Sequence, residues 1–67
     1  MWYITEDGEA VHIDKADSIT IFEEDDDEFL VRANFSSRWN KLKNFTNEED
    51  AKKYIAELVE KLNAEKQ

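Results

Sequence analysis

The sequence predicts a small α+β domain in which an antiparallel meander of four or five strands precedes one C-terminal amphipathic helix, packed on one face of the sheet. Three observations support this fold class. Apolar and polar residues alternate in short runs along the first two thirds of the chain. Turn-forming or acidic stretches separate these runs. The last third carries apolar residues at helical spacing, so a single domain over residues 1–67 accounts for the whole pattern.

The first two strands are predicted at about residues 2–5 and 10–13. Both runs contain aromatic or β-branched residues, which favour strands. Asp7 and Gly8 lie between them, and an Asp-Gly pair is a strong signal for a tight hairpin turn. A polar turn over 14–17 then leads to the third strand.

The third and fourth strands are predicted at about residues 18–23 and 28–35, again from alternation and β-branched side chains. Six consecutive acids, 23–28, join these two strands, and we expect this acidic run to form the loop of a hairpin. Residues 38–44 fit neither a strand period nor a helix period. The sequence therefore leaves open whether they form a fifth strand or a lid across the sheet, with Trp39 as its cover.

The helix is predicted at about residues 47–64. Its apolar residues recur three and four positions apart, as they do on one side of an α-helix. The segment from Thr46 to Glu49 has the form of a capping box, with Thr46 as the N-cap and Glu49 reaching back to its amide. The apolar stripe consists of Ala51, Tyr54, Ile55, Leu58, Val59 and Leu62.

Alternation along the strands assigns each side chain to one of two faces. The face expected to meet the helix carries Trp2, Ile4, Val11, Ile13, Ile19, Ile21, Phe29, Val31, Ala33 and Phe35. The opposite face carries Tyr3, His12, Thr20, Phe22, Leu30 and Arg32. Since one helix cannot cover both faces of a sheet, the large apolar side chains of the second face are expected to meet a partner protein.

The composition limits the classes of function. The chain has 17 acids, 9 bases and a net charge of −8, with four bases and no acid between residues 32 and 46. This acidity argues against direct binding of nucleic acid or of an anionic membrane, which both recruit Lys and Arg. The sequence contains no Cys, which is typical of a reducing compartment, so we expect a cytoplasmic protein.

We expect neither an enzyme nor a cofactor or metal protein. The single glycine, Gly8, excludes the glycine-rich loops that cradle phosphates. The only histidine, His12, lies in a predicted strand on the outer face, and no motif activates a serine nucleophile. The acidic run lacks the Gly and the spacing of a calcium-binding loop. No catalytic, cofactor-binding or metal-binding residue is therefore predicted.

Two groups of residues are candidates for contact with a partner. The candidate interface consists of Tyr3, Phe22, Leu30, Arg32 and Trp39. It would serve either a homodimer, in which the basic segment approaches the acids of a second copy, or a different partner protein.

The second group is the acidic run, which consists of Glu23, Glu24, Asp25, Asp26, Asp27 and Glu28. One interpretation is a solvated hairpin tip that keeps the protein soluble and blocks edge-to-edge pairing of strands. The other is a contact loop for a basic surface on a partner, including surfaces that normally bind nucleic acid. The leading hypothesis is a non-enzymatic interaction or self-association module, and the alternative is a phage or mobile-element inhibitor that blocks such a basic site.

Several short features occur together along most of the chain. They are Met1-Trp2 at the start of a strand, the acidic turn with Gly8, Ile19-x-Ile21, Val31-x-Ala33, and Phe45-Thr46-x-x-Glu49-x-Ala51. On these features the chain resembles a group of short, uncharacterised, acidic α+β proteins of Gram-positive bacteria and their phages. The basic segment from Arg38 to Lys43 departs from the shorter, less charged turn of that group. The group has no assigned activity, so the resemblance implies no functional residue.

Overall fold

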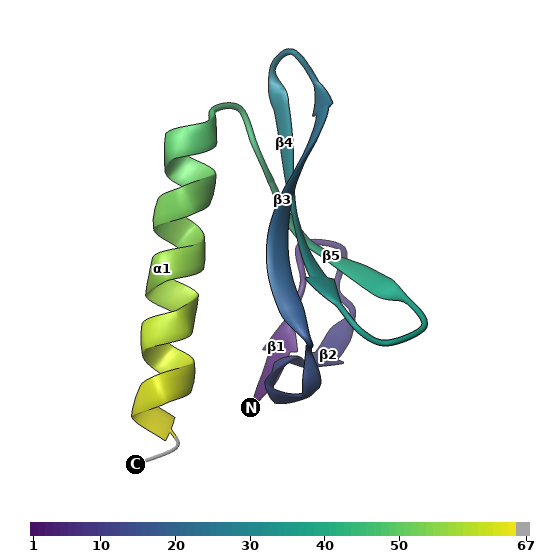
Figure 1. Cartoon of the computed structure of the whole chain (residues 1–67), viewed down its shortest axis with the longest axis vertical. Helices are drawn as coiled ribbons and strands as arrows, with labels where there is room; N and C mark the ends of the chain where they lie inside the picture. Colours follow the sequence, from purple (N-terminus) through teal and green to yellow (C-terminus); the bar gives the residue numbers. More distant parts are fainter. Residues whose placement is uncertain (66–67) are drawn as a thin grey trace.

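A computed structural model describes residues 1–65 of the chain, and the last two residues of the predicted domain lie outside it. The elements are β1 (Trp2–Ile4), β2 (Ala10–His12), a 3-10 turn η1 (Ile13–Lys15), β3 (Ser18–Asp25), β4 (Glu28–Asn34), β5 (Trp39–Phe45) and α1 (Glu48–Glu65). All strand pairs are antiparallel, and the helix follows the last strand (Figure 1). The predicted α+β class is confirmed, and residues 39–45 form a fifth strand.

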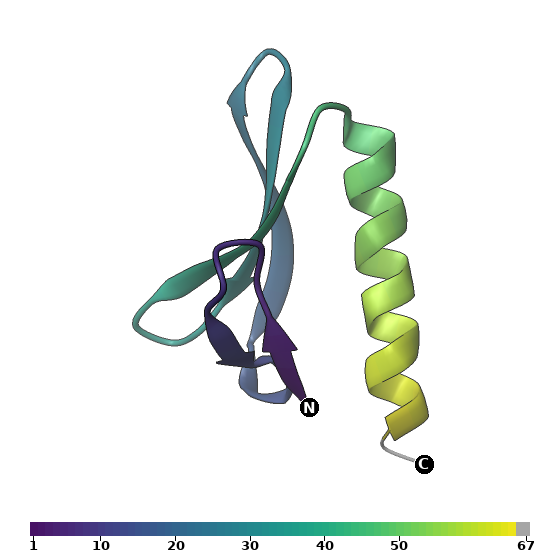
Figure 2. The same ribbon diagram turned by 180° about the vertical axis from the view of Figure 1, so that it is seen from behind.

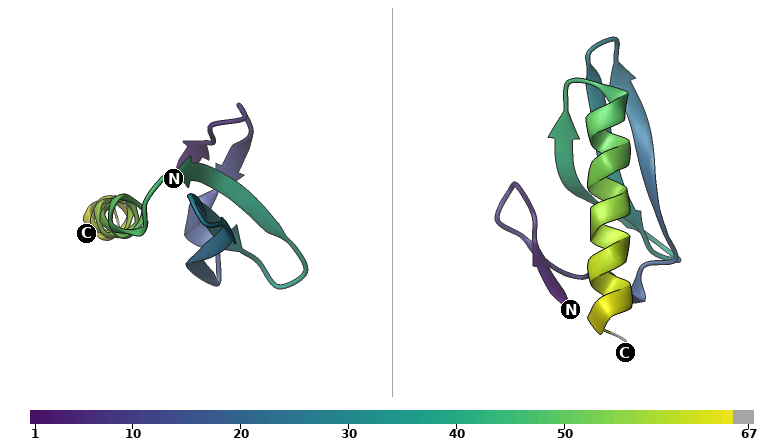
Figure 3. Two further views of the ribbon diagram at one scale, coloured as in Figure 1. Left: turned by 90° about the horizontal axis from the view of Figure 1, so that it is seen from above. Right: turned by 90° about the vertical axis from the view of Figure 1, so that its left-hand side faces the viewer.

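The strands are divided between two sheets. Strands β1 and β2 form a hairpin of their own, while β3, β4 and β5 form a three-stranded sheet in sequence order. The helix covers one face of the larger sheet, and the hairpin lies beside β5 (Figures 2 and 3). A backbone hydrogen bond of 3.2 Å from the Glu6 amide to the Leu42 carbonyl oxygen joins the hairpin to β5. The break between the sheets falls at η1, where the chain turns away from the ladder of β2.

The core lies between α1 and the larger sheet. Its buried side chains are Ile13, Val31, Ala33, Leu42, Ala51 and Leu58. The helix stripe is confirmed for Ala51 and Leu58, which are buried, and for three partly buried residues that pack against the core, Tyr54, Ile55 and Leu62. Val59 was expected in the stripe but is 41% exposed, because it lies at the margin of the helix face that meets the sheet.

The first hairpin has its expected turn. Gly8 has a φ of 86°, in the left-handed region that glycine tolerates best. Its amide donates to the Thr5 carbonyl oxygen at 2.9 Å, and the Thr5 amide donates to the Glu9 carbonyl oxygen at 2.8 Å. The buried Thr5 hydroxyl accepts a hydrogen bond of 3.0 Å from the Glu9 amide, so the turn satisfies its own polar groups.

The predicted faces of β1 were wrong. Trp2 pairs with His12, Tyr3 with Val11, and Ile4 with Ala10, and directly paired residues of antiparallel strands share a face. Val11 is buried, so Tyr3 points inward beside it and packs against the core. Trp2 and Ile4, which were expected to meet the helix, are the exposed pair.

The acidic run is not a loop, contrary to the prediction. Strand β3 continues to Asp25, strand β4 begins at Glu28, and these two residues pair, so only two residues make the turn. Phe29 pairs with Phe45 at the end of β5, so the hairpin continues past β5 as a two-stranded arm (Figure 1). Backbone pairing can continue there because the six acid side chains stay exposed to water, which screens their repulsion. We call residues 23–28 the acidic arm.

The helix cap lies one residue after its predicted position. The Asp50 amide donates to Asn47 Oδ1 at 2.8 Å, and Asn47 Nδ2 donates to Asp50 Oδ2 at 2.9 Å. Asn47 is thus the N-cap, and the Asp50 carboxylate accepts from its side-chain amide, in place of the predicted contact from Glu49 to the Thr46 amide. Asn caps a helix at least as well as Thr, and Thr46, the predicted N-cap, lies outside the helix.

Candidate functional site

The face of the larger sheet that points away from α1 carries an aromatic–arginine cluster, which consists of Phe22 on β3, Arg32 on β4 and Trp39 on β5. The guanidinium carbon of Arg32 lies 4.3 Å from the ring centroid of Phe22 and 4.7 Å from that of Trp39. Both distances are within the range of cation–π attraction. One cation therefore joins three strands on the outer face.

Strand register explains how these three side chains meet. Phe22 pairs with Leu30, and Arg32 is two residues beyond Leu30 on the same face of β4. An irregularity in the β4–β5 ladder at Val31 and Arg32 leaves Leu42 without a direct partner. Beyond it Trp39 pairs with Asn34, which places its ring on the same face as Arg32. Without this bulge Trp39 would point to the helix side of the sheet.

The predicted interface is thus only partly assembled. Phe22, Arg32 and Trp39 come together, and the rings of Phe22 and Trp39 remain 44% and 51% exposed. Leu30 pairs with Phe22 and lies on the expected face, but it is only 5% exposed and so offers little surface to a partner. Tyr3 belongs to the other side of the molecule, where its ring packs edge-on against Tyr54 at 6.3 Å.

The charge of Arg32 is not neutralised by an acid. Its Nε atom is buried without a hydrogen-bond partner, and among residues 1–64 no salt bridge includes this side chain. Other cations of the same segment also contact rings: Arg38 lies 5.3 Å from the ring centre of Phe35. Among the four bases between residues 32 and 46, only Lys41 forms a salt bridge within the described chain, at 3.7 Å from Asp7.

A second exposed apolar pair lies on the small hairpin. Trp2 and Ile4 are both exposed on the face opposite Tyr3, and the ring of His12 stacks on Trp2 at 4.8 Å with an interplanar angle of 29°. Sequence reasoning missed this pair because it assigned both residues to the core. The length of the Asp-Gly loop fixes the pairing register of the hairpin, and this register would have shown that both residues point outward.

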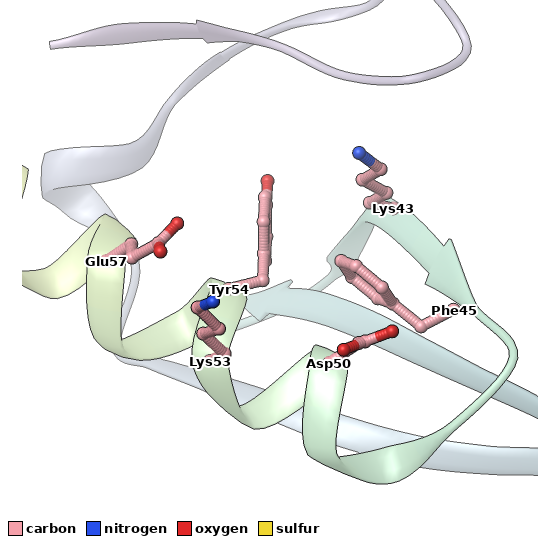
Figure 4. Close-up of a pocket in the computed structure, with 6 residues that line it drawn as sticks. All are labelled: Lys43, Phe45, Asp50, Lys53, Tyr54 and Glu57. Atoms are coloured by element: carbon pink, nitrogen blue, oxygen red, sulfur yellow. The ribbon is translucent and has the colours of Figure 1, made fainter.

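A shallow hollow of about 290 Å³ lies between β5 and α1 (Figure 4). It is lined by Lys43, Phe45, Asp50, Lys53, Tyr54 and Glu57. The ring of Tyr54 stands beside that of Phe45 at 5.3 Å, and Lys43 Nζ lies 5.5 Å from the centre of the Phe45 ring. Among these six side chains the described structure has no hydrogen bond or ion pair that would activate a nucleophile or hold a proton for transfer.

The two tyrosines beside this hollow are packed as core residues. Burial, with a smaller contribution from Glu6, raises the pKa of Tyr3 above its ordinary value of 10.0. The Tyr54 hydroxyl is buried without a hydrogen-bond partner. The raised pKa keeps the Tyr3 phenol neutral near pH 7, and its ring packs edge-on against that of Tyr54.

No group of three or more His, Asp or Glu side chains in residues 1–64 is arranged to hold a metal ion. No helix in that part of the chain is both long and apolar enough to cross a membrane. Comparison with protein-family models, curated proteins and solved structures finds no significant match to this chain.

Proposed function

We propose that this chain is a non-enzymatic protein-interaction module that binds another protein through the aromatic–arginine cluster. The observation that carries the proposal is a cation without an acid, held between two rings that are about half exposed. Arg and Trp are enriched among the residues that contribute most to binding energy. A partner carboxylate would pair with Arg32, while apolar side chains around it would cover Phe22 and Trp39.

The partner is either another protein or a second copy of this chain. A second copy would bring the required carboxylates, because the chain has 17 acids. Two identical faces can meet about a two-fold axis, the commonest symmetry of oligomers. Sedimentation of the purified chain at high micromolar concentration tests this version. A dimer that Trp39→Ser converts to a folded monomer supports it, and a monomer throughout leaves the heterologous partner.

A capture experiment from cell lysate tests the heterologous partner. The immobilised wild-type chain is compared with Arg32→Gln and with Lys52→Gln, a matched loss of one exposed charge on the far side of α1. Captured proteins that depend on Arg32 but not on Lys52 support the proposal, and we expect their recovery to fall at least about tenfold. Equal recovery on all three chains would refute it.

The acidic arm favours a second candidate function, in which the chain occupies a basic site on a host protein. The arm carries six exposed acids and no base on two paired strands, so its carboxylates are held in a fixed array. Such an array could replace the phosphates of a nucleic acid at its binding site and would also speed the encounter. In this second proposal the chain is an inhibitor encoded by a phage or mobile element and acts in the cytoplasm.

Salt dependence separates the two candidates. Capture through the arm should weaken steeply as salt rises and should fail for Glu24→Gln combined with Asp26→Gln and Asp27→Gln. Capture through the cluster should survive both changes, because its apolar contacts are not screened. If capture of a partner is unaffected by the arm variant and by Arg32→Gln, both candidate functions are excluded.

A further inference from the structure

We infer that the free edge of β3 is a docking site for an extended, basic segment of a partner protein, which adds to the sheet as a further strand. The inference rests on the proposed interaction function and names the kind of partner and its manner of binding. It uses the edge of β3, however, and does not require contact with Arg32 or Trp39. The two ideas can therefore fail separately.

Strand β3 is an edge strand over its full length of eight residues. It pairs with β4 on one side, and in the described chain no strand pairs with its other side (Figure 3). Such an edge exposes backbone N–H and C=O groups that can bind another strand. The opposite edge of the sheet is partly closed, because Glu6 bonds to the backbone of β5 through its amide and through its carboxylate, which accepts from the Asn44 amide at 3.2 Å.

An apolar seam runs beside this edge, between β3 and α1. On β3 the inward-pointing Ile19 and Ile21 pack against the core but are only partly buried. On α1, Tyr54 lies on the flank that faces β5. Successive residues are about 100° apart around a helix, so Ile55 and Val59 lie on the other flank, towards β3. Val59 is 41% exposed. A strand added to β3 would cover this seam with its own apolar side chains.

Charge selects the occupant of the edge. The last three residues of β3 are Glu23, Glu24 and Asp25, and the acidic arm contains no base. Opposite charges on neighbouring strands are favourable and like charges are not. A strand with Lys or Arg at this end is therefore attracted, while neutral or acidic strands are not.

A second copy of the chain fits this edge poorly. If two β3 strands pair antiparallel with Ile21 opposite its own copy, both helices lie on one face of the joined sheet. In that register Asp25 of each chain lies opposite Asp17 of the other, so like charges meet at both ends of that ladder. Each chain also brings a net charge of −8. A basic segment of another protein avoids both repulsions.

The experiment titrates the isotope-labelled full chain with a synthetic peptide in which Val alternates with Thr and both ends carry Lys. We expect saturable binding and slowed hydrogen exchange at alternate amides of β3, those that point away from β4. A peptide of the same sequence with alternate backbone amides N-methylated loses donors that pair with β3 and should not bind. Equal binding of the methylated peptide would overturn the inference.

Charge and seam variants complete the test. Glu23→Lys with Asp25→Lys should weaken binding of the basic peptide about tenfold, because two favourable pairs become repulsive. Glu57→Lys with Glu60→Lys makes the same change in net charge on the helix and should weaken it less than about threefold. Val59→Asn, at an exposed position, should leave the fold intact and weaken binding. The inference is refuted if the two double charge variants weaken binding equally or if Val59→Asn does not weaken it. It is also refuted if the chain forms dimers through β3 and does not bind the peptide.

Arg32→Gln serves to distinguish this inference from the proposed function. The basic peptide should bind this variant as it binds the wild type, because the cluster lies on the face of the sheet and the peptide at its edge. If Arg32→Gln abolishes peptide binding, the edge is not the site. If the peptide does not bind while lysate capture still depends on Arg32, the inference about the edge is wrong and the proposed function stands.

Discussion

Replacing Leu58 with Ala tests the packing of the helix on the sheet. Leu58 is 3% exposed and belongs to the buried cluster between α1 and the strands. Truncation removes its transfer energy and leaves a cavity, which together typically destabilise a protein by about 2–5 kcal/mol. A chain of 67 residues has a total stability of roughly 3–10 kcal/mol, at about 0.05–0.15 kcal/mol per residue. The variant should therefore lose a large part of its stability.

The assay is thermal and urea unfolding followed by circular dichroism. In a domain of this size each 1 kcal/mol lowers the Tm by roughly 4–8 °C, so we expect Leu58→Ala to lower it by at least about 8 °C. The matched control is Val59→Ala, the next residue of the same helix, which is already 41% exposed. It should change stability by less than about 1 kcal/mol, since Ala also favours the helix. Equal shifts for the two variants, or a shift of only a degree or two for Leu58→Ala, would refute the packing described above.

The stability that Leu58→Ala is expected to remove is close to the total stability of the domain. A milder substitution at the same position keeps the measurement possible if that variant does not fold. Leu58→Met conserves volume and should cost less than about 1.5 kcal/mol. If Leu58→Ala does not fold while Leu58→Met does, the result supports the buried position. If Leu58→Met also fails to fold, the loss does not follow from cavity formation and the reasoning is wrong.

Three further predictions concern the turn, the cap and the response to pH. Gly8→Ala should lower stability by about 1 kcal/mol in urea unfolding, because a φ of 86° strains a residue with a Cβ even where nothing lies within 4 Å of it. Asn47→Ala should lower it by about 0.5–2 kcal/mol, while Thr46→Ala should have little effect, since Asn47 makes the capping hydrogen bond. Above pH 10 the wild type should lose stability more steeply than Tyr3→Phe. The folded state raises the pKa of Tyr3, so its contribution is complete below the unfolded value of 10.0 and is lost as pH rises through the folded value.

Each of these has an outcome that contradicts it. An unchanged urea midpoint for Gly8→Ala would mean that the turn relaxes without strain. A larger effect of Thr46→Ala than of Asn47→Ala would restore the cap that the sequence suggested. Parallel pH profiles for the wild type and Tyr3→Phe would show that ionisation of Tyr3 is not coupled to folding.

The helix was predictable because its signal depends on one chain segment alone. Apolar residues at helical spacing indicated a buried side, and Ala51 and Leu58 occupy it. The cap was predicted one residue early because Thr46 and Asn47 are both good N-cap residues and adjacent. Local preference cannot choose between them, whereas the path of the chain from β5 into α1 does.

To predict which face of β1 is buried, the pairing register of the hairpin must be known, and the pattern of residues does not contain it. Alternation shows that Trp2 and Ile4 share a face, but the loop length of the hairpin decides which face it is. A shift of one residue in this register exchanges the two faces of the strand. The structure pairs Trp2 with His12, and this pair turns outward while the buried Val11 turns inward.

The segment 39–45 resisted assignment for a similar reason. Leu42 and Phe45 both point towards the helix side although they are three residues apart, which a regular strand does not allow. The irregularity in the β4–β5 ladder resolves this by inserting one residue into β5. It also places Trp39 beside Arg32, so the cluster could be predicted for its β3 and β4 members and not for its β5 member.

The acidic arm shows that charge alone does not indicate a loop. Six adjacent acids have low strand propensity, and the sequence placed all of them in a turn. Strands can nevertheless pair there if their backbone groups bond to each other and the acid side chains on both faces remain in water. In the structure the backbone pairing continues to Asp25 and Glu28, and all six acids are exposed. The carboxylates of the acidic arm are consequently held at regular spacing along two paired strands, whereas those of a mobile loop would not be.

The three candidate surfaces meet along β3. Phe22 ends the apolar part of the strand and Glu23 begins its acidic part, while the free edge runs beside both. A partner segment along this strand would meet carboxylates at one end and apolar side chains at the other. Exposed charges act mainly on the rate of association, whereas desolvated aromatic contacts act on the rate of dissociation. Under either proposal, the acidic arm would therefore mainly speed the encounter with a partner, while the apolar contacts of the cluster or of the seam would slow its release.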